Sequence, residues 1–299
     1  MAMVVALVLV AVGSVLFHFM APSLGWWWTP IASNWGYVDD TIIATFWITG
    51  TVFVAIVLFM AYCVLRYRYK PERRAAYEPE NKKMEWWLTG LTTLGVAGML
   101  TPGLFVWDQF ISVPEDAAQV EAVGQQWQWS FRYPGEDGVL GTTNFRNISY
   151  ENPFGLDPGD PNGQDDVLIE GDELHLPLDK PVKMLLRSID VLHDFYVPQF
   201  RAKMDMVPGM ITYFWLTPTR TGEFDILCFE LCGVGHYAMR GTVIVEEASA
   251  FQAWLQEQPT FAELSAQAED GTRNVMTLVV SEGEADTAVR GGAWGTQTD

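Results

Sequence analysis

The sequence predicts a membrane-anchored all-β protein, in which transmembrane helices precede one exported β-rich domain. Two observations support this fold class. Three long, uncharged apolar stretches occupy the first 110 residues. From residue 117 onward, apolar and polar residues alternate instead, as in half-buried strands. The chain of 299 residues is 49% hydrophobic and only 18% charged, so it is neither a disordered acidic chain nor an ordinary soluble enzyme.

Each apolar stretch is long enough to cross a bilayer. Residues 41–65 and 86–107 contain no charge, and about twenty apolar residues suffice for a crossing. Residues 1–20 are also uncharged and could form a span or a signal peptide. No basic segment opens them and no A-x-A motif precedes Ala21, which favours a retained span. We therefore expect an N-terminal transmembrane helix at 1–20 and a helical hairpin over 41–110.

Basic residues are confined to one of the two connections between these spans. The connection 66–85 holds all seven Lys and Arg residues of the first 110, and 21–40 holds none. Basic loops stay in the cytoplasm, so 66–85 is predicted inside and 108–299 outside. Tryptophans at the span edges are typical of interfacial anchors: Trp26, Trp27, Trp28, Trp35, Trp86, Trp87 and Trp107.

The negative charge of the chain lies in its exported part. Residues 1–110 hold seven basic and seven acidic side chains, whereas 111–299 hold eleven and thirty, which accounts for the net charge of −19. An acidic surface repels phosphates, so binding to nucleic acid is excluded. The same surface attracts basic partners.

Short strand-like runs fill the exported domain, which we expect at 111–260. They lie at 127–133, 166–170, 173–178, 182–189, 211–217, 224–228 and 241–246, with Gly, Pro or Asp between them. Many short strands with turn signals predict a closed sandwich or barrel. A Gly/Pro/Asn/Asp-rich excursion at 134–165 interrupts them. A short helix is expected at 248–258, and 261–299 is predicted to be a flexible acidic tail.

The segment from Cys228 to Met239, CFELCGVGHYAM, combines two thiols, an imidazole and a thioether. Such soft ligands suit copper, whereas zinc gains nothing from a thioether. Cys, His and Met on one loop, with another His upstream, is the ligand order of mononuclear blue-copper sites. One copper has no need of two thiolates, two imidazoles and a thioether. The second cysteine, Cys232, therefore favours two coppers that share both sulfurs.

The upstream imidazole has to come from one of three histidines. His193 follows a predicted strand in a strand-end loop, where ligands are commonly presented, and is the expected ligand. His175 is expected on a strand surface, and His18 lies in the first span. Cys63, within the second span, is expected to be a small packed side chain.

A disulfide is the alternative for the two cysteines of the motif, since the domain is predicted to lie in an oxidising compartment. The intervening Glu230 and the His and Met that follow Cys232 at fixed spacing disfavour it.

Three segments, GQQWQWSFRYP, SIDVLHDFYVP and CFELCGVGHYAM, resemble cytochrome c oxidase subunit II, the electron-accepting subunit of haem–copper oxidases. The likeness covers roughly residues 40–250, and C-x-E-x-C-x3-H-x2-M is among the more specific metal motifs. The resemblance implies a bacterial-type, inner-membrane protein. Its Greek-key cupredoxin domain would lie on the periplasmic side and carry a binuclear, mixed-valence copper centre called CuA.

The resemblance also implies a ligand set: His193, Cys228, Glu230, Cys232, His236 and Met239. The two cysteines would bridge both coppers. His193 and Met239 would complete one copper. His236 and the backbone carbonyl of Glu230 would complete the other. The side chain of Glu230 would also reach a magnesium site shared with subunit I. Arg240 stands where mitochondrial members commonly have proline, so the surroundings of that copper are expected to differ.

Two further residues receive roles only through the resemblance. Trp127, the first tryptophan of the W-x-W-S pair, would receive the electron; the alternative is that Trp127 and Trp129 both pack in the sheet. The string here is Gln-Gln-Trp-Gln-Trp, whereas His-Gln-Trp-Tyr-Trp is frequent in the family. Glu85 stands near the place where a family glutamate opens a proton path into subunit I. A solvated carboxylate at a helix start is the alternative.

The implied function is oxidation of ferrocytochrome c at CuA and delivery of electrons to haem in subunit I, where oxygen becomes water and protons are translocated. The acidic domain would steer a basic cytochrome c. Asp190, Asp194 and Asp205 lie close in sequence to the copper and tryptophan segments, without an assigned docking role.

This chain cannot reduce oxygen alone. Its predicted spans hold a single histidine, His18, and it has no C-x-x-C-H motif, so a haem-bearing partner is required.

Three alternatives remain open from the sequence. The same centre could serve a nitric oxide reductase. The chain could be an exported copper-storage or delivery protein, or a tethered receptor domain with a disulfide. The spans disfavour a nitrous oxide reductase, and quinol-oxidising relatives lack the copper ligands.

Overall fold

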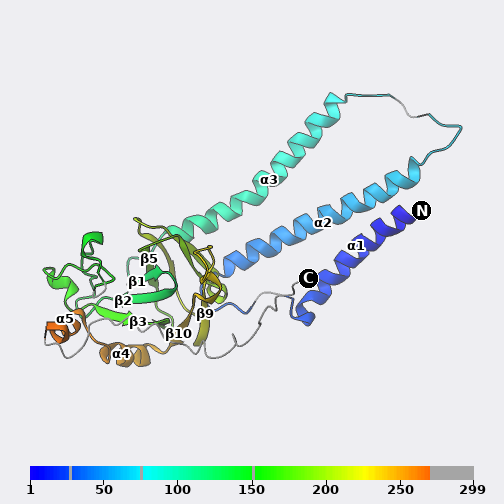
Figure 1. Ribbon diagram of the computed structural model, residues 1–299. Coiled ribbons are helices and arrows are strands. Elements are labelled where there is room, and N and C mark those ends of the chain that lie inside the picture. The colour runs from blue at the N-terminus through cyan, green and yellow to red at the C-terminus, as the bar shows by residue number, and fades with distance from the viewer. Residues whose placement is uncertain (27–28, 75–76, 150–151, 270–299) are drawn as a thin grey trace, which may run out of the picture.

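The computed structural model describes residues 1–26, 29–74, 77–149 and 152–269; Trp27 and Trp28 lie outside this part (Figure 1). Three long helices precede a β-domain: α1 (Ala2–Met20), α2 (Gly36–Arg66) and α3 (Lys82–Ile111). Within the described residues, these are the helices long and apolar enough to cross a membrane. Their lengths and order agree with the predicted fold class.

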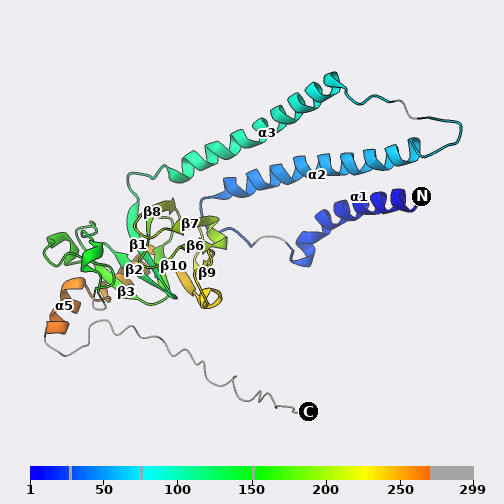
Figure 2. The same cartoon turned by 45° about the horizontal axis from the view of Figure 1, so that its top comes forward.

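The three helices are packed unequally. Helix α1 lies along α2, and the buried side chains are small or β-branched: Val4 and Ala11 on α1, Val57 and Ala61 on α2. Helix α3 diverges from α2 away from the β-domain in both views (Figures 1 and 2). None of the described residues of α3 is buried. Its apolar surface is therefore available to lipid or to another membrane subunit.

Ten strands in the described part of the chain form two five-stranded sheets. The first has the order β3-β2-β1-β5-β8, with β1 (Ala118–Gln125), β2 (Gln128–Tyr133), β3 (Val167–Glu170), β5 (Val182–Ser188) and β8 (Thr212–Leu216). The second has the order β4-β10-β9-β6-β7, with β4 (Glu173–Pro177), β6 (His193–Val197), β7 (Ala202–Met206), β9 (Gly222–Cys228) and β10 (Arg240–Glu246). Inward-facing side chains of both sheets share one core, which includes Trp129, Phe195 and Phe214.

The segment that enters α2 is fixed to the β-domain. Trp35 is fully buried, and its indole Nε1 donates a hydrogen bond to the Trp215 carbonyl at 2.9 Å. Trp215 in turn donates from its own Nε1 to the Gln109 carbonyl, near the end of α3. Arg201 pairs with Asp39 at 2.6 Å at the start of α2. These contacts hold the β-domain close to the ends of both α2 and α3.

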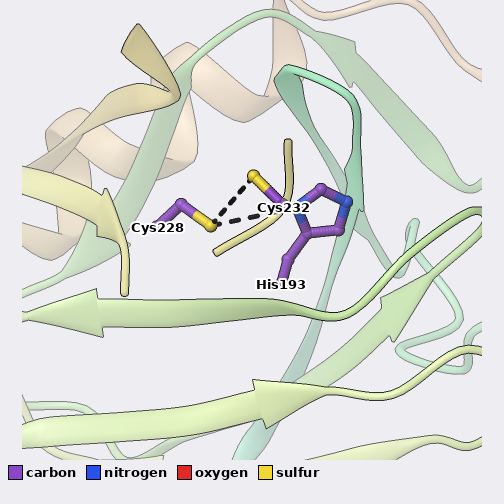
Figure 3. Close-up of side chains that lie close together, drawn as sticks. All are labelled: His193, Cys228 and Cys232. Carbon is purple, nitrogen blue, oxygen red and sulfur yellow. Dashed lines mark hydrogen bonds between the residues drawn. The ribbon is translucent and has the colours of Figure 1, made fainter. Parts of the chain in front are cut away.

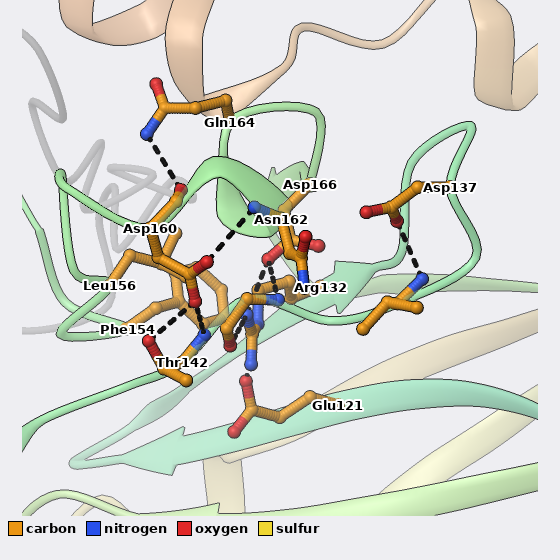
Figure 4. A network of polar contacts seen from close by, with 12 residues as sticks. Glu121, Arg132, Asp137, Thr142, Phe154, Leu156, Asp160, Asn162, Gln164 and Asp166 are labelled. Atoms are coloured by element: carbon orange, nitrogen blue, oxygen red, sulfur yellow. Dashed lines mark hydrogen bonds and ion pairs between the residues drawn. The ribbon is translucent and has the colours of Figure 1, made fainter.

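The excursion at 134–165 is tied to the first sheet by buried charges (Figure 4). Arg132 on β2 lies between Glu121 on β1, at 2.7 Å, and Asp166 at the end of the excursion, at 2.6 Å. Arg187 on β5 pairs with the other oxygen of Glu121 at 3.0 Å and donates to the Phe154 carbonyl. Two positive and two negative side chains therefore balance each other beneath the excursion.

The tail prediction was wrong for residues 261–269. They form helix α5 (Phe261–Glu269), and Phe261 and Leu264 are buried in a second apolar cluster with Phe154 and Leu156 of the excursion. The cause is the amphipathic pattern of this segment, which finds an apolar face on the excursion. Residues 270–299 lie outside the described part.

The prediction for His175 was also wrong. Rather than standing on a strand surface, it is buried on β4 under helix α4 (Ala248–Gln256). Its Nδ1 lies 2.8 Å from Glu246 Oε1, and its ring stacks on Trp254 with centroids 3.8 Å apart. The sequence could not reveal this, because it did not show that α4 would cover β4.

Replacing Arg132 by methionine is expected to lower the free energy of unfolding by about 3–5 kcal/mol, because Asp166 and Glu121 would keep buried charges with too few partners. The control is Arg240→Met, since Arg240 pairs with Asp225 at 3.5 Å with both side chains more than half exposed; it should cost at most about 1 kcal/mol. Urea denaturation of the detergent-purified chain measures both. Equal losses would contradict the assigned role of the buried network.

Candidate metal centre

Strand pairing brings the two halves of the site together. Strands β6 and β9 are antiparallel neighbours, with Phe195 opposite Cys228. His193, two residues before Phe195, thereby lies at the end of the sheet where Cys228 ends β9. The sequence placed His193 in a loop, but it is the first residue of β6. The segment 229–239 then turns back, and the Cys228 amide donates to the Met239 carbonyl at 3.2 Å.

The sulfur and nitrogen donors converge at this turn (Figure 3). Cys228 Sγ lies 3.7 Å from Cys232 Sγ and 3.8 Å from His193 Nδ1. The ligand atoms of these three residues all lie within 4.8 Å of one another. Cys232 Sγ lies 3.6 Å from His236 Nδ1 and 3.8 Å from Met239 Sδ. All five predicted side-chain ligands are therefore assembled around the two sulfurs.

The predicted backbone ligand is also in place. The carbonyl oxygen of Glu230 lies 3.3 Å from Cys228 Sγ.

The donors are sheltered from solvent, and the two cysteines are free thiols. His193 is fully buried, and Cys228, Cys232 and Met239 are at most 7% exposed, whereas His236 is half-buried. A separation of 3.7 Å between the sulfurs is far longer than the S–S bond of about 2.05 Å. The disulfide alternative does not describe this structure, and both sulfurs are available as metal ligands.

The donor set fits copper. Ligands bound to one metal at about 2.0–2.3 Å, in a roughly tetrahedral arrangement, lie about 3.3–3.8 Å apart. The five separations from the two sulfurs, 3.3 to 3.8 Å, fall in this range. Thiolate, imidazole and thioether together favour copper over harder metals. Each of the two sulfurs contacts a different imidazole.

The surroundings shift the pKa values of the two thiols in opposite directions. Burial by itself would raise the pKa of Cys228, but hydrogen bonds with His193 and nearby backbone groups outweigh it and lower that pKa to about 6. Burial and the neighbouring Cys228 raise the pKa of Cys232 to about 12. Cys228 is therefore the first of the two thiols to lose its proton. A bound cation would favour loss of the second proton.

Asp190 contacts the nitrogen of the His193 ring that faces away from the sulfurs. Its Oδ1 accepts the Nε2–H of His193 at 2.8 Å, which leaves Nδ1 as the nitrogen that faces Cys228. Its Oδ2 accepts the backbone N–H of Gln126 at 2.6 Å. Carboxylates commonly hold the outer nitrogen of metal-binding histidines in this way. The sequence placed Asp190 near the copper segments without a role; its spacing of three from His193 was the available signal.

The two tryptophans of the aromatic run have different environments. Trp129 is fully buried and packs edge-on against Phe195, with ring centroids 5.8 Å apart. Trp127 is 39% exposed. Its ring lies against the backbone of Gly233 and Gly235 in the metal-ligand segment. Core packing thus describes Trp129 but not Trp127, which lies at the surface against the metal-ligand segment.

Glu85 is not part of this site. It lies exposed in the first turn of α3, at the end of that helix remote from the β-domain (Figure 1).

The chain is similar to known proteins over most of its length. Residues 118–248 match the family described as cytochrome c oxidase subunit II, periplasmic domain. The alternative cytochrome c oxidase subunit 2 of Bradyrhizobium diazoefficiens is 67% identical over 265 residues, which cover 89% of this chain and 95% of that protein. The chain belongs to the cytochrome c oxidase subunit II family. It is thus a subunit of an oxidoreductase complex, and its β-domain is of the cupredoxin-like type that carries the CuA centre in this family.

More distant relatives extend the comparison. Cytochrome c oxidase subunit 2 of Cereibacter sphaeroides is 28% identical over 240 residues, which cover 77% of each protein. The solved periplasmic domain of subunit II (CoxB) of Bradyrhizobium japonicum is 28% identical, covers 48% of this chain and 95% of that one, and has a TM-score of 0.36.

Replacing Asp190 by asparagine is expected to weaken copper binding by about 10–100-fold, because the outer nitrogen of His193 would lose its carboxylate partner. Competition with a copper chelator on the detergent-purified chain measures this. Asp225→Asn is the matched control, since Asp225 is exposed on β9 and pairs only with exposed Arg240 among the described ion pairs. An unchanged affinity in Asp190→Asn would show that the carboxylate does not support the metal ligand.

Proposed function

We propose that this chain is the electron-accepting subunit of a haem–copper oxidase, and that it takes electrons from a cytochrome c at a binuclear CuA centre. The observation that carries the proposal is the convergence of the donors. The two sulfurs lie 3.7 Å apart, and two imidazoles, a thioether and a backbone carbonyl each lie within 3.8 Å of one of them. A dicopper centre that shares two thiolates spreads a transferred electron over both metals. The six donors from the chain leave no coordination position assigned to a substrate, which favours electron relay over bond chemistry.

The contacts of the two sulfurs and the family resemblance together define the proposed ligand set. Cys228 contacts His193, and Cys232 contacts both His236 and Met239. By that resemblance, Cys228 and Cys232 would be shared by two coppers, His193 and Met239 would complete one, and His236 with the Glu230 carbonyl would complete the other. We further propose that the Glu230 side chain contributes to a magnesium site at the interface with subunit I.

The proposal also assigns partners and orientation. The basic connection 66–85 would lie in the cytoplasm of a bacterium and the β-domain on the periplasmic side of the inner membrane. The unburied surface of α3 fits a haem-bearing membrane subunit.

Electrons would arrive from a basic cytochrome c, attracted by the acidic domain, and pass through Trp127. They would leave to haem in subunit I, where oxygen is reduced to water with proton translocation. Glu85 is proposed at the cytoplasmic start of a proton path.

Cys228→Ser is expected to abolish both cytochrome c oxidation and the signal of an unpaired electron shared over two copper nuclei, because one bridging sulfur is lost. Electron paramagnetic resonance, metal analysis and oxygen uptake of the purified complex measure these effects. Cys63→Ser, in the second helix and remote from the site, is the control and should retain two coppers per chain and full activity. A single exchangeable copper in the native chain would instead support a delivery protein, and retention of signal and activity in Cys228→Ser would contradict the assignment.

A further inference from the structure

We propose that Gly235 is a positioning residue for electron acceptance, because its missing side chain lets the Trp127 indole lie directly on the backbone that joins Cys232 to His236. The inference rests on the proposed function, since it concerns how electrons reach the copper centre. It adds a requirement at a position that supplies no ligand.

The space above Gly235 is already filled by the indole. A β-carbon built on Gly235 would come within 2.6 Å of Trp127 Cγ and 2.8 Å of Cε3, and real β-carbons essentially never approach another heavy atom within 3.0 Å. The clash involves the part of the ring that joins the side chain to its own backbone. It cannot be relieved by a small movement at the outer edge of the indole, so the whole ring would have to move.

The backbone at Gly235 does not itself require glycine. Its φ of −89° and ψ of 6° are accessible to alanine. Gly233 differs, because its φ of +123° disfavours any side chain irrespective of space. Alanine at 235 therefore tests the contact with Trp127 with little backbone strain, whereas alanine at 233 would test two effects at once.

The indole is held against the loop by bonds to its neighbour. The Gln126 backbone N–H donates to Asp190 Oδ2 at 2.6 Å, and the Gln126 side-chain Nε2 donates to the Cys232 carbonyl at 2.7 Å. Asp190 also holds the imidazole of His193. The residue before Trp127 is thus fastened to both metal-ligand segments. A β-carbon at 235 would have to push the ring outward against this fixed turn.

The position of the ring suits a relay between a donor and the centre. One side of Trp127 contacts the backbone between two ligands, while 39% of its surface is open to solvent. A ring pushed outward would still be exposed to the donor but would lose contact with the ligand-bearing backbone. Electron acceptance should slow without a change in any ligand.

Gly235→Ala in the assembled oxidase is expected to lower the rate of copper reduction by ferrocytochrome c by about tenfold, the scale of loss expected when reacting groups are misplaced by a fraction of an ångström. Stopped-flow absorption measures this rate. The shared-electron copper signal should stay unchanged. Gly159→Ala is the matched control, because a β-carbon there meets its nearest neighbour at an ordinary 3.4 Å; it should leave the rate unchanged.

A double variant isolates the contact. In a Trp127→Ala background both the indole and the Cγ that would clash are absent, so adding Gly235→Ala should produce no further loss of rate. If Gly235→Ala alone fails to assemble, assembly of the double variant would support the clash with the indole. Failure of the double variant as well would overturn the inference.

The remaining outcomes separate this inference from the proposed function. A normal rate in Gly235→Ala with an intact copper signal would overturn the inference alone. Absence of the shared-electron signal from the native complex would overturn the proposed function, and this inference with it.

Discussion

The antiparallel pairing of β6 with β9 is the constraint on which the site depends. His193 and Cys228 are thirty-five residues apart in the chain, yet the register that sets Phe195 opposite Cys228 brings their nitrogen and sulfur within 3.8 Å. The same sheet places β10 beside β9, so the loop that carries the other ligands must return to the strand from which it departs. A ladder of backbone hydrogen bonds thus brings donors from separate segments of the chain together.

Polar contacts then hold the loops that lie outside the strand pairing. Asp190 bonds to His193 and to the Gln126 backbone, and Gln126 bonds to the Cys232 carbonyl. At the opposite end of the domain, Trp35 and Arg201 fasten the β-sandwich to the helices. These contacts give the donor segments and the β-domain fixed positions within the fold.

The candidate site could be predicted from the sequence because ligand chemistry is local. The C-x-E-x-C-x3-H-x2-M motif contains five of the six predicted ligand residues. The length of the apolar stretches predicts the membrane spans, and the position of the basic residues predicts their orientation. Strand β6 was missed because four of its five residues are buried, so it lacks the alternation that marks a half-buried strand. Contacts between distant segments could not be predicted from the sequence either, because they depend on which faces meet after folding. Examples are the stacking of Trp254 on His175 and the packing of Phe261 in one cluster with Phe154.

We propose that two sulfurs hold a pair of copper ions. X-ray absorption at the copper edge of the purified oxidase tests it most directly, because a second metal atom close to the absorber produces its own scattering signal. Copper–copper scattering together with sulfur and nitrogen neighbours is expected. Sulfur and nitrogen neighbours without a metal–metal contribution would contradict it.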